Sequence, residues 1–202
     1  MTLALARVLA QSHADAGLEQ FNALQNVAYE AKEKSRPVTF VEYVAKAVPA
    51  ITSLSFAAEL FLKVVAFQHF GVYPRSHDLV EMYMQLPTET RADLAVTYAD
   101  LYSRPLPLQV VHFGLSAGPD SDRTPTSTMP PADTLADALD HLRSAFISWR
   151  YVYEQMAAPT STDVNFKALL SVIECLNIQV RSHLGDSIVT LGVAPSDGGS
   201  VV

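Results

Sequence analysis

Apolar residues recur three or four positions apart along most of the chain, which predicts helices. Residues 2–34 contain one strong turn signal, Gly17, and predict a long amphipathic helix. After Pro37, Thr39 and Glu42 have the spacing of a capping box that opens a short helix. Proline fits the first turn of a helix better than its interior, so Pro49 predicts a boundary before the next helix.

The next helix is expected to run to about Phe70, with Gly71 as its left-handed cap. Ser76 is predicted to cap a third helix, and Thr88 a fourth that ends near Tyr102. The clearest heptad pattern predicts a fifth, and its seam consists of Leu135, Leu139, Leu142, Phe146, Trp149, Tyr153 and Met156.

A sixth helix is predicted from about Asp163, with an apolar face that includes Phe166, Leu169, Ile173, Leu176, Val180 and Leu184. No segment shows sustained alternation with a period of two. The sequence therefore predicts an all-α protein, a helical bundle of four to six helices.

Residues 103–133 differ from the rest because they hold six of the twelve prolines. Such a segment cannot form regular helix, although its first half, with the run VVHF, has apolar residues that can pack on the body. We expect one helical domain over residues 1–192, with this insert, and a flexible tail at 193–202.

The composition of 49% hydrophobic and 17% charged residues predicts a globular protein that buries part of its surface in a homodimer. A net charge of −7 argues against broad binding of nucleic acid, although a local basic site remains compatible with it. Cys175 is the single cysteine, so a reducing cytoplasm is the expected setting and a buried structural thiol its expected state.

The first 17 residues lack a basic leader region and are interpreted as mature helix. The stretch from Val48 to Tyr73 is long enough to span a bilayer, but Glu59 and Lys63 lie inside it. Each would cost about 2.5 to 3.5 kcal/mol in a membrane. We therefore expect a core helix of a soluble protein, and no membrane partner.

Glu59 and Lys63 are four residues apart, in the favourable order for an ion pair on a helix. The apolar residues around them leave little of the helix exposed, which favours partial burial. Buried charges need partners. Helix spacing suggests that Glu59 pairs with Arg150, whose planar fork binds a carboxylate, and that Lys63 pairs with Glu154 or Asp78.

Candidate chemistry is sparse. His77 beside Asp78 suits an acid or base oriented by a carboxylate, with Arg75 or Arg150 completing a pocket, but helix capping also explains both residues. Tyr151 is the aromatic residue left free to stack on a base. Asp137 and His141 lack a further metal ligand, and no glycine-rich phosphate loop occurs. We predict no metal and no cofactor.

The runs AELFLK, SHDLVEMY and FISWRYVYE, separated by a glycine turn and the insert, resemble the HEPN superfamily over about residues 50–185. The resemblance implies a dimeric helical bundle. Its members include metal-independent ribonucleases of toxin–antitoxin and phage-defence systems, and noncatalytic proteins that bind nucleotides, RNA or partner proteins.

The catalytic signature of that family is Arg, four to six residues, then His on a late helix. Here no His follows Arg143 or Arg150 at that spacing, and the Arg7–His13 pair that has it lies on the first predicted helix. We expect a noncatalytic or degenerate module linked to RNA or to a partner protein. The alternatives are an active ribonuclease that uses Arg150 and His77, and a structural dimer scaffold.

Overall fold

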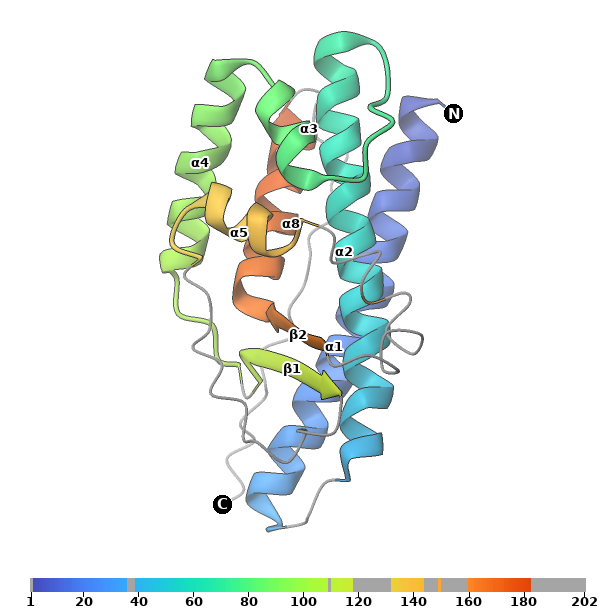
Figure 1. Cartoon of the computed structure of the whole chain (residues 1–202), viewed down its shortest axis with the longest axis vertical. Coiled ribbons are helices and arrows are strands. Elements are labelled where there is room, and N and C mark those ends of the chain that lie inside the picture. Colours follow the sequence, from blue (N-terminus) through green and yellow to red (C-terminus); the bar gives the residue numbers. More distant parts are fainter. Residues whose placement is uncertain are drawn as a thin grey trace, which may run out of the picture.

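The computed structural model describes residues 2–35, 39–108, 110–117, 132–143, 149 and 160–182. Its main feature is an antiparallel pair of long helices, α1 (Leu3–Glu33) and α2 (Phe40–Phe70), that runs the length of the molecule (Figure 1). A Cβ at Gly17 would lie 2.6 Å from Cγ of Leu54, so the two backbones approach closely at this level. Glycine is therefore required for this packing.

Both ends of α2 are as predicted. Thr39 and Glu42 form a complete capping box, and Gly71 adopts φ 70°, the left-handed conformation that glycine reaches without strain. The predicted boundary at Pro49 is wrong, because α2 continues through it. Proline removes one helical hydrogen bond. The burial of its neighbours Val48, Ala50 and Ile51 in the core outweighs that loss.

Three more helices lie beside the α1–α2 pair in the upper part of Figure 1: α3 (Leu79–Gln85), α4 (Thr88–Ser103) and α5 (Leu135–His141). The predicted caps of α3 and α4 are wrong. Asp78 caps α3, since its carboxylate accepts hydrogen bonds from the N–H groups of Val80 and Glu81. Pro87 precedes α4, and no side chain caps it.

The predicted fifth helix is shorter in the structure, where α5 ends at His141 with Leu142 as its C-cap. Its seam residues Leu135, Leu139, Leu142 and Trp149 are nonetheless buried. The seam positions Phe146, Tyr153 and Met156 lie outside the described residues.

The last described helix, α8 (Phe166–Ser182), runs between α4 and the α1–α2 pair (Figure 1). It begins three residues later than predicted, because Asp163 lies in a strand. The predicted apolar face is confirmed over Phe166, Leu169, Ile173, Leu176 and Val180, all buried. Leu184 and the predicted tail lie outside the described residues.

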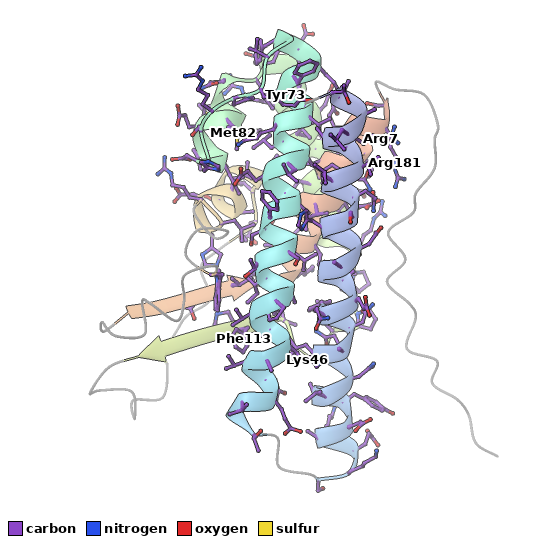
Figure 2. All side chains as sticks on the ribbon, turned by 90° about the vertical axis from the view of Figure 1, so that its right-hand side faces the viewer. Arg7, Lys46, Tyr73, Met82, Phe113 and Arg181 are labelled. Carbon is purple, nitrogen blue, oxygen red and sulfur yellow. The ribbon has the colours of Figure 1, made fainter. Side chains whose placement is uncertain are left out.

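The bundle also carries a two-stranded antiparallel sheet that the sequence did not predict. β1 (His112–Ala117) pairs with β2 (Thr160–Asn165) in a register from His112 opposite Asn165 to Ala117 opposite Thr160. Figure 2 shows the strands standing out sideways from the helices, with Phe113 beside α2. The protein remains an all-α helical bundle with a small sheet appended.

The first half of the proline-rich insert packs on the body, as predicted. The Gln25 amide of α1 exchanges two hydrogen bonds of 2.9 Å with the backbone N–H and carbonyl of Val110, and Val110 and Phe113 are buried. Val111 accepts a hydrogen bond of 2.9 Å from the N–H of Phe166, the first residue of α8. Residues 118–131 lie outside the described part of the chain.

Within the described residues, one helical segment, Val41–Phe70, is long and apolar enough to cross a membrane by length and composition. In its most apolar window, 72% of the residues are buried inside the molecule. A core helix has this property, and α2 is packed against α1, α3 and α8. Within this bundle, α2 is a core helix.

Candidate functional site

The candidate site is a cluster of ionisable side chains where the chain after α2 folds back along that helix. Glu59 lies in the middle of α2, with buried neighbours Ala58 and Leu60, and its side chain is 2% exposed. Its Oε1 atom lies 2.9 Å from Nζ of Lys63, whose side chain is 13% exposed. The predicted burial of this pair is confirmed, and within the pair each charge is the other's partner.

His77 supplies a second contact to the same carboxylate oxygen. Its Nδ1 atom lies 2.8 Å from Oε1 of Glu59, and its side chain is 55% exposed. Gly71 ends α2, and the irregular segment after it brings His77 back to the level of Glu59. With Nδ1 turned to a buried carboxylate, Nε2 is the ring nitrogen left to meet a ligand.

Asp78, the residue after His77, links the start of α3 to Arg143 just beyond the end of α5. One carboxylate oxygen caps α3, and the other accepts a hydrogen bond of 2.7 Å from Nε of Arg143, which also lies 3.4 Å from Asp140. The backbone N–H of Glu81 and the Arg143 guanidinium lower the pKa of Asp78, against a smaller opposing effect of burial. Asp78 is therefore held ionised at neutral pH.

Ser76, which the sequence predicted as the cap, supports the turn. Its hydroxyl accepts a bond of 3.1 Å from the N–H of Asp78 and donates one of 2.6 Å to Glu81. The turn that carries His77 is thus fixed on both sides, by Ser76 and by the Asp78 cap.

The structure brings together three of the predicted site residues and replaces one predicted pairing. Lys63 and His77 both contact the same carboxylate oxygen, Oε1 of Glu59. The pairing of Lys63 with Asp78 is wrong, because Asp78 bonds to Arg143. The chain reversal after Gly71 determines both partners, and helix spacing does not contain that information. Arg75 is exposed, two residues before His77.

Three predicted site residues, Arg150, Tyr151 and Glu154, lie outside the described residues, and so do the proposed pairs that involve them. The Arg7–His13 spacing falls on α1. The His13 ring packs edge-on against Phe56 of α2, with centroids 4.6 Å apart. Figure 2 shows Arg7 on the same upper side of the bundle as Arg181 of α8.

Sequence reasoning missed a second cluster at the sheet. Nε2 of His112 lies 3.3 Å from Oδ1 of Asp163 across the two strands, and the Asp163 carboxylate occupies the space that a Cβ at Gly114 would fill. His141, at the end of α5, is near enough to both that their charges affect its pKa, which burial lowers. His112 and Asp163 are far apart in the sequence, so their contact could be found only once the pairing of β1 with β2 was known.

Neither cluster is arranged as a metal centre. The described ranges contain no group of three or more His, Cys, Asp or Glu side chains placed to hold a metal ion. Asp137, paired with His141 as a possible ligand in the sequence, instead bonds to Thr134 at the start of α5. The first cluster can instead orient the exposed imidazole of His77 beside two side-chain cations, Lys63 and Arg143, which are already paired with carboxylates.

No protein-family model, curated protein or solved structure matches this chain.

Proposed function

We propose that this protein is a noncatalytic, HEPN-like module that binds RNA at the surface formed by Arg75 and His77. The supporting observation is the buried Glu59 carboxylate, which holds both Lys63 and His77 at one oxygen. The Glu59 carboxylate fixes the His77 ring at the surface, while Lys63 balances the negative charge of Glu59 inside the bundle. The runs AELFLK and SHDLVEMY, which carry the HEPN resemblance, contain these three residues.

The cations next to His77 support binding over cleavage. Phosphodiester cleavage without a metal needs positive groups aimed at the developing charge on phosphate. In the described part of this site, Lys63 is bonded to Glu59, and Arg143 is bonded to Asp78 and near Asp140. These carboxylates already neutralise both cations. Arg75, which is exposed, is the cation beside His77 left to meet a phosphate, and a single such group suits binding better than stabilisation of a cleavage transition state.

Arg75 and His77 suit a contact with one or two backbone phosphates. Both are exposed, and phosphate oxygens accept hydrogen bonds from guanidinium and imidazole N–H groups. The net charge of −7 opposes a wide phosphate footprint. We therefore expect short single-stranded RNA to bind with a weak dependence on salt. By the same resemblance, we propose a cytoplasmic homodimer acting in a bacterial defence or toxin–antitoxin system.

The test measures binding and cleavage of labelled RNA, unstructured and hairpin, with no metal added. We expect binding without cleavage, and binding at least several-fold weaker for Arg75→Ala and His77→Gln. Lys32→Ala is the matched control, because Lys32 is an exposed cation in the last turn of α1, far from His77. Equal losses in all three variants would indicate nonspecific charge attraction and contradict the proposal.

A second candidate is an active ribonuclease with His77 as general base. The contact of 2.8 Å between His77 and a buried carboxylate is the observation that favours it, since such a contact orients an imidazole for proton transfer. Metal-free cleavage that His77→Gln abolishes, in protein shown to be folded by circular dichroism, would establish this candidate. Absence of both binding and cleavage by a well-folded dimer would favour the structural scaffold.

A further inference from the structure

A cavity of about 250 Å³ lies between α1, α4 and α8, apart from the His77 cluster. Five branched aliphatic side chains line most of it: Leu18, Leu101, Leu106, Leu170 and Ile178. Arg104 and Ile178 are its exposed lining residues and mark the side open to solvent. An apolar cavity of about 150 Å³ in a protein holds a benzene molecule. This one therefore has room for two fused small rings.

One polar group in the cavity lacks a full set of partners. Glu174 of α8 lines it, and its Oε2 atom is enclosed without a hydrogen-bond partner. Burial raises the pKa of Glu174, while Arg181, the side-chain amide of Asn177 and Arg104 lower it by smaller amounts. A buried carboxyl oxygen without a hydrogen bond costs stability, so Oε2 of Glu174 would gain from a donor supplied by a ligand.

The charges around Glu174 indicate the kind of ligand. Arg104 is paired with Asp100 at the cavity rim, and the charge of Arg181 offsets that of Glu174. A charged ligand would add an unbalanced charge beside leucine side chains, which is costly. A neutral hydrogen-bond donor would bond to the carboxyl group without that cost.

From these contacts we infer that the cavity binds a small, neutral, largely apolar molecule with a single hydrogen-bond donor directed at Glu174. The site is independent of the proposed function, since it shares no residue with the His77 cluster. Ligand pockets commonly combine apolar walls with a few polar groups that fix orientation. Here Glu174, with the buried Ser171 one turn before it, is that polar part.

Two probes of the same shape test the inference. Indole has one N–H donor and no charge, and benzofuran has the same two fused rings with oxygen in place of N–H. We expect indole to cause saturable chemical-shift changes in ¹⁵N-labelled protein and to bind about tenfold more tightly than benzofuran, the usual effect of one buried hydrogen bond. No saturable binding of indole, or equal affinities for both probes, would overturn the inference.

Two variants tie the binding to this cavity. Glu174→Leu should remove the preference for indole over benzofuran, whereas Glu19→Leu, at an exposed glutamate of α1, should leave it unchanged. Ile178→Phe should weaken both probes by filling the cavity from its open side, where a larger side chain does not threaten the core. An unchanged preference in folded Glu174→Leu protein, or unchanged affinity in Ile178→Phe, would contradict the inference.

Discussion

Oε1 of Glu59 and Nδ1 of His77 lie 2.8 Å apart, although one residue is on α2 and the other precedes α3. This contact links the buried interior of α2 to an exposed ring. Lys63 approaches the same oxygen from one helical turn along. The Glu59 carboxylate thus both pairs with Lys63 and orients His77, and its removal should affect the stability of the protein and the orientation of the ring.

The ion pair of Glu59 and Lys63 should be strongly coupled. Glu59→Ala leaves the nearly buried Lys63 unpaired, so we expect a loss of about 3 to 5 kcal/mol in the free energy of unfolding, the usual cost of breaking a buried pair. A double-mutant cycle with Lys63→Ala, measured by urea denaturation, should give a coupling energy above about 1 kcal/mol.

The chain offers a control for that cycle. Glu30 and Lys34 have the same spacing on α1 and lie 3.6 Å apart, but their side chains are 51% and 66% exposed. An exposed pair at this spacing couples by about 0.3 to 0.5 kcal/mol. Similar coupling energies for the two pairs would show that burial does not strengthen the Glu59 cluster.

Asp78 should matter more as a helix cap than as the partner of Arg143. Asp78→Ala removes two hydrogen bonds to the first turn of α3 and should cost about 1 to 2 kcal/mol. Asp78→Asn retains a good cap and loses the charge, and Arg143→Ala removes a half-exposed partner, so each should cost less than about 1 kcal/mol. Chemical denaturation at pH 7 measures the order of the three variants.

The same residue predicts an acid-side loss of stability. The pKa of Asp78 is lowered in the folded protein, so its contribution is complete above the ordinary aspartate pKa and is lost as pH falls from about 4 through the folded value. Asp78→Asn should flatten the stability curve in that range. An unchanged slope below pH 4 would mean that other carboxylates dominate it.

Local signals in the sequence were sufficient to predict the helical fold class and both ends of α2. The Thr39–Glu42 capping box and the Gly71 cap each depend on a few adjacent residues, and both were predicted. The helix boundary predicted at Pro49 was wrong. Proline indicates only the local cost of continuing a helix, whereas the burial of Val48 and Ile51, which offsets that cost, depends on the tertiary structure. The sheet was missed because β1 and β2 are short and their pairing joins distant segments.

For the candidate site, burial could be predicted but most partners could not. The apolar residues around Glu59 and Lys63 were enough to predict that these charges are sheltered. The contact with His77 depends on how the chain reverses after Gly71, and that of Asp78 with Arg143 on how α5 crosses α3. Such contacts depend on tertiary structure, which the spacing of residues along a helix does not encode.

His141 should give a stability change near neutral pH. Burial lowers its pKa, with His112 acting in the same direction and Asp163 and Asp140 opposing. The folded state therefore binds fewer protons than the unfolded state, so stability is full above the ordinary histidine pKa of about 6.5 and falls below it. Between pH 7 and 5 we therefore expect the free energy of unfolding to fall as this residue gains a proton in the unfolded state.

The comparison of wild type with His141→Gln isolates that contribution, because the other five histidines are present in both proteins. Urea denaturation at several pH values between 5 and 7.5 should show a smaller pH slope for the variant. The same slope in both proteins would show that His141 does not sense pH through folding.

Gly17→Ala should destabilise the protein even though alanine is the better helix former. In an exposed helix interior this change stabilises by about 1 kcal/mol. Here the new Cβ would lie 2.6 Å from Cγ of Leu54 and 3.0 Å from its backbone nitrogen, so α1 and α2 would have to move apart. Overpacking of this kind costs about 1 to 3 kcal/mol.

Thermal and urea denaturation of Gly17→Ala, alone and with Leu54→Ala, measure this effect. Leu54→Ala removes the side-chain part of the clash but creates a cavity, so the two changes should cost less together than the sum of their separate costs. The remaining contact with the Leu54 backbone should keep the double variant below wild type. A stabilised Gly17→Ala protein would mean that α1 and α2 do not pack this closely, and with that the core that supports Glu59 would need revision.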